Sequence, residues 1–426
     1  MAAAGAAALA LAACGSSGGS GGSNQTSGVT ITVALAADPP PKAELDAFTK
    51  QTGIHVKWVN LDWDSLQTKI SAAATAKTFF ADATDVDWSR VGQLGKLGWF
   101  YPMSQYMNTK SLSSDMPQLA SFTSDGKVIG IPYDASFMVT TVNTDLFSKA
   151  GITSMPTTLD DYTNDLKKIQ SSGVSQHPLN IPFSAAEGLS TYWYETTGAL
   201  GGTILDSSGK PQFASPSSPG YKAAEWMVNA IKTGLVPAGN INVADSQGEQ
   251  TLMAKGQVAS TYSDYSGVIS TLYNSPKSST VVNKIKYLPT PGATGTAANL
   301  SNPDGIGIPV QAKYPKAAAK FIEWFTSAKQ QLEFTGANGQ SKAWSAYTLP
   351  SHLSAVQTMA KGNLAGGTTL SAMLAKSKPV FEGGAPSWYP AFSNAVYTNL
   401  HAAATGSKSV AQAISAIVSA TNGLSS

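Results

Sequence analysis

The stretch VTITVALAADPPPKAELDAFTKQTGIHVKWV (29–59) decides the kind of fold. Residues 29–35 and 54–59 are short runs of apolar and β-branched side chains, which favour strands. Between them, Asp38 and the three prolines after it indicate the start of a helix, and Gly53 suits its C-terminal end. The stretch therefore predicts a strand, a helix and a second strand.

The same order continues immediately after this stretch. Asp62 or Asp64 can cap a helix that runs to about Ala76, and residues 84–88 predict a third strand. Strands that alternate with helices argue for a parallel sheet with helices on its faces.

The rest of the chain is less regular but still mixes strands with helices. A good helix is predicted over 157–170, where Thr158 can cap and Asp161 follows three residues later. A long amphipathic helix is predicted over 315–334 and another over 221–236. Further strands or hairpin arms are predicted over 126–133, 138–143, 256–263 and 281–292.

Composition narrows the classes of function. The chain has 426 residues, enough for two or three domains, and 28 Lys+Arg balance 26 Asp+Glu, which makes nucleic acid a poor partner. Arg90 is the only arginine. Since guanidinium groups are the usual clamps for carboxylate and phosphate, a neutral, hydroxyl-rich ligand fits better.

Cys14 is the only cysteine, and its surroundings predict lipid attachment. Residues 1–13 match the apolar part of a signal peptide, although no Lys or Arg precedes them, so translation is expected to begin upstream of Met1. Residues 14–28 form a flexible Gly/Ser tether after the cysteine. We therefore expect a lipoprotein on the extracellular face of the cytoplasmic membrane, held by acyl chains.

Five fragments in order resemble the bacterial extracellular solute-binding proteins of the maltose-binding type. The most specific covers residues 126–162, where Gly130-Ile131-Pro132, Asp145-Leu146-Phe147, Ala150-Gly151-Ile152 and Pro156-Thr157-Thr158 match the family pattern. The others are residues 31–56, 84–107, 256–267 and 304–331. Val142-Asn143 replaces the usual Tyr-Asn, and 256–267 lacks the usual Met and Trp.

The resemblance implies a two-lobed α/β fold of the periplasmic-binding-protein type II, each lobe a mainly parallel sheet flanked by helices. Lobe one would combine 29–136 with 305–345, and lobe two 137–304 with 346–426. Hinge crossovers would lie near 133–137, 303–307 and 344–349. The function implied is that of the substrate-binding lipoprotein of an ABC importer. Its partners would be the permease and a small ligand, a mono- or oligosaccharide held between the lobes of a monomer.

Sugars present apolar C–H faces and a rim of hydroxyls, so a sugar cleft should mix aromatic rings with carboxylates in loops. Such mixtures occur in several loops and strand ends of this chain. The candidate ligand-binding residues are Asp38, Trp63, Asp64, Asp87, Trp88, Tyr133, Asp134, Phe137, Trp193, Glu195, Tyr262, Asp264, Tyr265, Asp304, Trp344 and Trp388.

Ordinary structural roles compete at each of these positions. Trp226 and Trp324 have helical spacing and are expected in the core, and Trp58 and Trp99 are expected to pack as well. An Asp beside a loop is more often a helix cap, and Arg90 can simply pair with Asp87. The four histidines show no metal-ligand spacing, and no cofactor is expected.

Two other functions remain open from the sequence. A polyamine or another non-sugar solute would also suit Trp and Asp side chains. An anchored carbohydrate-active enzyme would need two carboxylates about 5–9 Å apart, which acid content alone does not exclude. No catalytic motif stands in a suitable context, so we expect a binding protein rather than an enzyme.

Overall fold

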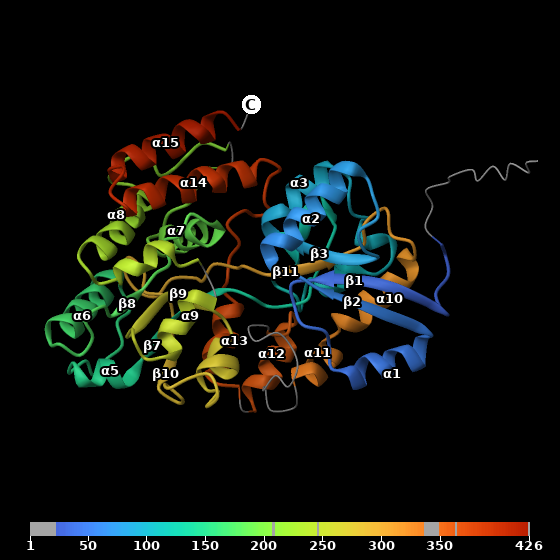
Figure 1. Cartoon of the computed structure of the whole chain (residues 1–426), viewed down its shortest axis with the longest axis horizontal. Coiled ribbons are helices and arrows are strands. Elements are labelled where there is room, and N and C mark those ends of the chain that lie inside the picture. The colour runs from blue at the N-terminus through green and yellow to red at the C-terminus, as the bar shows by residue number, and fades with distance from the viewer. Residues whose placement is uncertain (1–22, 207–208, 245–246, 336–348, 363, 425–426) are drawn as a thin grey trace, which may run out of the picture.

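The chain folds into two lobes that lie side by side in Figure 1. This computed structural model describes residues 23–206, 209–244, 247–335, 349–362 and 364–424. The two-lobed α/β fold predicted from the sequence is confirmed. Among the described residues, no helix combines the length and apolar character needed to cross a bilayer.

The first lobe is built on a five-stranded sheet with the order β2-β1-β3-β11-β6. Strand β1 pairs in parallel with β2 and β3, whereas β11 runs antiparallel to both β3 and β6. The strands are β1 (Val29–Leu35), β2 (Ile54–Asn60), β3 (Ala83–Asp87), β6 (Ile131–Pro132) and β11 (Asp304–Gly307). A small hairpin of β4 (Thr123–Ser124) and β5 (Lys127–Val128) lies beside it.

Alternating side chains of β1 are buried on both faces of this sheet. Ile31 and Val33 pack with α1 (Lys42–Thr52) and α10 (Pro315–Phe325), while Ala34 packs with α2 (Trp63–Ala76) and α3 (Val91–Lys96). Two shorter helices, α4 (Thr109–Leu112) and α11 (Ala328–Thr335), complete this part of the chain. Asp62 caps α2 by accepting a hydrogen bond from the Ser65 amide, as predicted.

The second lobe has a four-stranded sheet with the order β10-β7-β9-β8. Its strands are β7 (Met138–Asn143), β8 (Leu179–Asn180), β9 (Ser260–Tyr265) and β10 (Ile285–Leu288). Its helices are α5 (Thr144–Lys149), α6 (Leu159–Ser171), α7 (Glu187–Ala199), α8 (Pro219–Lys232), α9 (Gln247–Ala254), α12 (Leu353–Ala360), α13 (Gly367–Leu374), α14 (Tyr389–Ala404) and α15 (Val410–Asn422).

Three details differ from the prediction. The second sheet is mostly antiparallel, because β7 runs against both β9 and β10 and only β8 and β9 are parallel. The helix expected over 315–334 is divided into α10 and α11, and Ser327 starts the second by accepting from the Gln330 amide. Residues 192–195, expected in a turn-rich region, lie inside α7.

Helix α7 escaped prediction because it is buried on nearly all sides. Eleven of its residues are buried, so it has no apolar stripe with a polar opposite face. Its five threonine and tyrosine residues are also poor helix formers. Tertiary packing against α8 and α14 therefore overrides the weak local preference.

The chain passes between the lobes after β6 and again before β11. The first crossing, residues 133–137, connects β6 to β7, and the second, residues 301–303, leads into β11. The third crossover predicted at 344–349 lies almost entirely outside the described residues, and the residue-level lobe boundaries stay a prediction.

Candidate functional site

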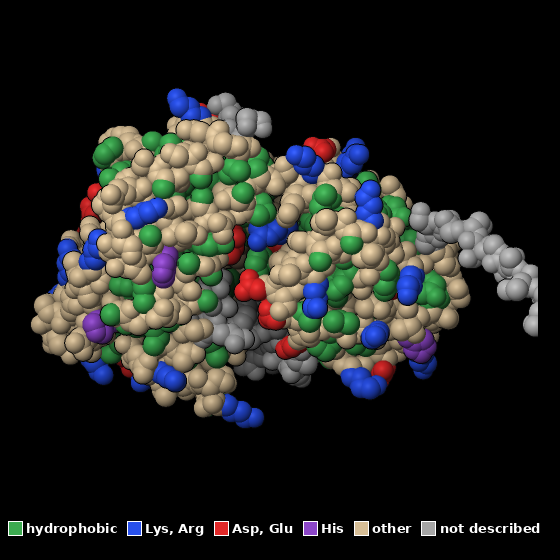
Figure 2. Space-filling model, turned by 45° about the horizontal axis from the view of Figure 1, so that its top comes forward, with side chains coloured by type: hydrophobic (Ala, Val, Ile, Leu, Met, Phe, Trp, Pro, Cys, Tyr) green, Lys and Arg blue, Asp and Glu red, His purple; other side chains and the backbone are tan. Residues whose placement is uncertain are grey.

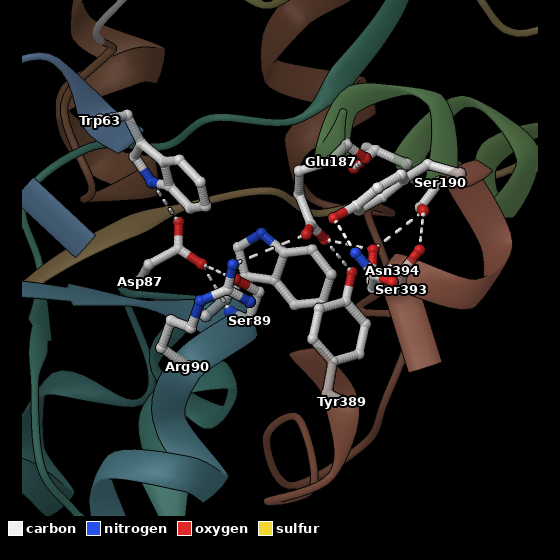
Figure 3. A network of polar contacts seen from close by, with 12 residues as sticks. Trp63, Asp87, Ser89, Arg90, Glu187, Ser190, Tyr389, Ser393 and Asn394 are labelled. Carbon is white, nitrogen blue, oxygen red and sulfur yellow. Dashed lines mark hydrogen bonds and ion pairs between the residues drawn. The ribbon is translucent and has the colours of Figure 1, made fainter. Parts of the chain in front are cut away.

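A polar network begins at the carboxyl end of β3, where the first lobe faces the second (Figure 3). Asp87 ends the strand and accepts hydrogen bonds from the amide and hydroxyl of Ser89, which fixes the short 3-10 helix Trp88–Arg90. Its other oxygen accepts from the Trp63 indole at 3.0 Å. The carboxylate therefore orients the indole ring of the first residue of α2.

Arg90 reaches from this short helix to the second lobe. Its guanidinium lies 3.6 Å from the Glu187 carboxylate and 5.3 Å from the centre of the Trp63 ring. Glu187 is the first residue of α7, so the ion pair joins the two lobes. Acidic and basic side chains meet in the hollow between the lobes in Figure 2. The sequence spacing had suggested that Arg90 pairs with Asp87. In the structure its ion-pair partner is Glu187 instead.

Glu187 has further partners on α14. It accepts hydrogen bonds from the hydroxyls of Tyr389 at 2.5 Å and Ser393 at 2.9 Å. Burial raises the pKa of Glu187, against the opposing effect of the Arg90 charge. The Tyr389 ring lies 5.2 Å from the ring of Trp88, whose indole donates to Asn302 at 2.7 Å beside the second crossing. The network thus links both lobes to the hinge.

Four aspartates cluster where the crossings leave the first lobe. Asp87 is opposite Asp304 in the pairing of β3 with β11, and Asp134 accepts from the Asp304 amide at 2.8 Å. Asp85 accepts from Gln67 at 2.6 Å. Burial raises the pKa of Asp134 to about 7, and burial together with the neighbouring carboxylates raises the pKa of Asp85 and Asp304 well above the usual range. Burial and the mutual repulsion of the carboxylates therefore favour the protonated forms of Asp85, Asp134 and Asp304.

A cavity of about 1190 Å³ opens beside this network, on the second lobe. It is lined by three parts of the chain, 194–206 together with Gly209, 293–300 and 378–388. Trp388 lines the cavity, and the next residue is Tyr389 of the network. The two regions are therefore neighbours.

Several sequence-predicted residues lie in the core of the second lobe instead. Trp193 is fully buried and donates to the Gly220 carbonyl at 2.8 Å. Asp264 is fully buried and accepts from Tyr273 and Thr141. Tyr262 and Phe137 are buried as well, and Tyr262 packs against Trp226. These side chains have interior partners and do not face the network.

Glu195 has a mixed position, because it lines the cavity and is nearly fully buried. It accepts from the Thr290 hydroxyl at 2.8 Å and from the Leu300 amide at 2.6 Å, and it thereby holds the segment that leads into the second crossing. Burial raises its pKa to about 7.

The remaining candidates lie outside the network. Asp38 and Asp64 are exposed, and Asp38 accepts from Asn60 at 2.8 Å. Tyr265 is half-buried, and Tyr133 is buried in the first lobe's core. Trp344 and the proposed lipid site Cys14 lie outside the described residues.

Sequence reasoning missed Glu187, Tyr389, Ser393 and the network role of Arg90. The only early signal was the unusual status of Arg90 as the single arginine, since the helix that carries Glu187 was not predicted. Among the described residues, no group of three or more His, Cys, Asp or Glu side chains has a geometry suited to a metal ion.

Comparison with known proteins identifies the family of this chain and solved structures with a similar fold. Residues 24–332 match the family described as bacterial extracellular solute-binding protein. A Brucella abortus protein named as a binding protein is 27% identical over 207 residues, 48% of this chain and 49% of its own length, so the match spans about half of that relative.

A Sinorhizobium fredii protein named as an amino-acid ABC transporter periplasmic-binding protein is 25% identical over 66% of this chain and 64% of its own. Among solved structures, the maltose-bound MalE3 of T. maritima superimposes with a TM-score of 0.79 at 21% identity. The superposition covers 93% of this chain and 100% of that one, and it shows that the two folds are alike.

Proposed function

Because this chain belongs to the bacterial extracellular solute-binding proteins, we propose that it is the substrate-binding protein of an ABC importer and that it captures a sugar or polyol between its lobes. The ligand is then handed to a membrane permease. The relative of known structure named above was solved with maltose, which supports a carbohydrate.

The single observation that carries the proposal is the network that joins the two lobes. Asp87, Trp63 and Arg90 come from the first lobe, while Glu187 and Tyr389 come from the second. Rings, carboxylates and a guanidinium suit the C–H faces and hydroxyls of a sugar. A ligand that needs groups from both lobes favours the closed arrangement by its differential affinity.

A thermal-shift screen tests the ligand class directly. Purified protein is scanned with monosaccharides, oligosaccharides, sugar alcohols, amino acids and polyamines. A ligand at 100 times its dissociation constant should add about 2.7 kcal/mol of stability. If only sugars or polyols stabilise the protein, the proposal is supported. If no sugar and no polyol stabilises it, the ligand assignment is contradicted.

One observation favours a second ligand class. Arg90 and Glu187 place opposite charges 3.6 Å apart at the lobe boundary, a pair that a zwitterionic amino acid could exchange for its own carboxylate and ammonium. The Sinorhizobium fredii relative is named for amino acids. The same screen separates the two classes, because amino acids would then shift the melting temperature and sugars would not.

We also propose that the protein binds its ligand without altering it. A binder returns an oligosaccharide intact after long incubation, whereas an anchored glycoside hydrolase shortens it. Chromatography of the saccharide after incubation decides between them.

The proposal also includes the site residues predicted above and the limits of the two lobes. Lobe one is proposed to comprise 29–136 and 305–345, and lobe two 137–304 and 346–426. Small-angle scattering with a tight ligand should show compaction, because closure brings the network's two halves together. An unchanged radius of gyration would count against a closing cleft.

We further propose that Cys14 carries a lipid that holds the monomeric protein at the outer face of the cytoplasmic membrane. Replacement Cys14→Ser should release the protein from the membrane fraction and abolish incorporation of labelled fatty acid. Retention in the membrane would contradict a lipid anchor.

A further inference from the structure

The cavity on the second lobe, lined by 194–206 with Gly209, 293–300 and 378–388, is named the side cavity. We propose that the side cavity holds additional sugar rings, so that the ligand is an oligosaccharide whose first rings lie at the lobe boundary and whose later rings lie in this cavity. The inference rests on the proposed sugar-binding function and goes beyond it in ligand size.

The first argument is volume. The side cavity measures about 1190 Å³. Pockets that enclose a drug-sized molecule measure about 300–1,000 Å³. A single sugar ring is smaller than such a molecule, so a monosaccharide would leave most of this space to water.

The second argument is the chemistry of the walls. Aromatic side chains from two segments, Tyr194, Phe381 and Trp388, line the cavity. The rings of Phe381 and Trp388 are perpendicular, with centroids 6.1 Å apart. Thr203 supplies a hydroxyl from the same segment as Tyr194, and Thr294 and Thr296 supply hydroxyls from 293–300. A saccharide chain needs aromatic rings against its apolar C–H faces and polar groups against its hydroxyls, and this wall has both.

The third argument is the strap formed by residues 378–388. It starts on the second lobe, where the amide of Lys378 donates to Asn299 and its carbonyl accepts from Ser301. It then touches the first lobe so closely that a Cβ on Gly384 would lie 2.3 Å from the Thr123 carbonyl. The strap therefore separates the side cavity from the first lobe and gives it a wall of its own.

The fourth argument is continuity with the interlobe network. Trp388 lines the side cavity, and Tyr389 donates to Glu187 within the network. The Tyr389 ring also lies 5.6 Å from that of Phe381. A chain of sugar rings that begins at the Arg90–Glu187 pair can thus continue past these aromatic rings.

Two glycines provide a matched pair of variants for the test. Gly198 lines the side cavity, and Gly239 lies elsewhere in the second lobe. A Cβ at either position would meet no atom within 4 Å, and neither has a positive φ. Gly198→Trp should therefore fill part of the cavity without distorting the backbone, and Gly239→Trp serves as its control.

The experiment is calorimetry on the full-length wild type and both variants. The probes are glucose, xylose, N-acetylglucosamine and mannitol, together with α-1,4-glucan, β-1,4-glucan, β-1,4-xylan and chitin oligomers of two to five rings. We expect affinity to rise about 10-fold or more between one ring and three or more rings of one series. Gly198→Trp should remove that gain and leave binding of the shortest ligand within about 2-fold, and Gly239→Trp should change neither.

Other outcomes have distinct meanings. Tight binding of a monosaccharide or mannitol without any gain from added rings overturns the side-cavity assignment and leaves the proposed function intact. A gain from length that Gly198→Trp does not reduce also overturns the assignment. Failure of every saccharide and polyol to bind overturns the proposed ligand class itself.

Discussion

Asp87 in the first lobe and Asp264 in the second are both buried carboxyls beside aromatic residues, but their partners differ. Asp87 orients Trp63 and the helix that carries Arg90, all at the lobe boundary. Asp264 accepts from Tyr273, Thr141 and the Tyr265 amide, all within the second lobe. One arrangement prepares a surface for a ligand, and the other completes a core. Each prediction below tests whether this division between binding and stability is correct.

The largest effect is expected at Asp264. The Asp264→Ala substitution leaves the buried Tyr273 and Thr141 hydroxyls without their acceptor, and we expect a loss of about 3–5 kcal/mol in the free energy of unfolding. Urea denaturation measures the loss, with Asp264→Asn as the milder control because it keeps one acceptor oxygen. Ligand affinity of the folded fraction should stay within about 2-fold. A large loss of affinity with little loss of stability would break the comparison.

The next effect concerns Glu195 and pH. Burial raises its folded pKa from 4.5 to about 7, so the native state binds more protons than the unfolded state between these values. The contribution of Glu195 to the free energy of unfolding is therefore fully present below about pH 4.5 and is lost as the pH rises to about 7. Glu195→Gln should flatten the slope by up to about 1.4 kcal/mol per pH unit, measured by denaturation between pH 5 and pH 7.

Part of the slope should survive in that variant. Asp134 also has its pKa raised to about 7, and its contribution has the same sign. The double variant Glu195→Gln, Asp134→Asn should therefore be flatter than either single variant. An unchanged slope in Glu195→Gln would mean that the wild-type carboxyl has the same protonation in the folded and unfolded states over this range.

A smaller stability effect and a clear binding effect are expected at Arg90. Arg90→Gln removes the ion pair with Glu187, whose side chain is only 20% exposed. Because the pair joins the lobes, the closed arrangement should lose about 1 kcal/mol, which lowers ligand affinity about 5- to 10-fold. Calorimetry measures the affinity, and Lys42→Gln, which removes an exposed pair with Asp46, is the matched control. Equal behaviour of the two variants would show that the Arg90 pair has no special role.

Much of the fold follows from local patterns, while the site depends on tertiary packing. Strand β1, helix α6 with its Thr158 cap and helix α1 with Gly53 at its end appear where the pattern places them, because each signal is local. The division of 315–334 into two helices was missed, because a continuous apolar stripe does not reveal that Ser327 starts a new helix. Antiparallel pairing of β7 was also missed, since pairing partners are distant in sequence.

For the site, adjacency of an aromatic and an acidic residue was an incomplete guide. It selected Asp87 and Trp88, which lie in the network, and equally Trp193 and Glu195, which lie in a helix that is buried on nearly all sides. It missed Glu187, the partly buried first residue of that same helix. What distinguishes them is whether a side chain of this helix meets the lobe boundary, as Glu187 does, or the interior of the second lobe, as Trp193 does, and no local pattern in this segment reports it.

The smallest effect is expected at Asp64, the exposed neighbour of Trp63. Asp64 stands in the first turn of α2, where a carboxylate interacts favourably with the helix N-terminus, but Asp62 already caps that turn. Asp64→Ala should therefore change the free energy of unfolding by less than about 0.5 kcal/mol and ligand affinity by less than about 2-fold. Calorimetry and urea denaturation on the same preparation give both values. A 10-fold loss of affinity would extend the ligand contact beyond Trp63 onto the exposed start of α2, and the binding surface of the first lobe would then be wider than the network that joins the lobes.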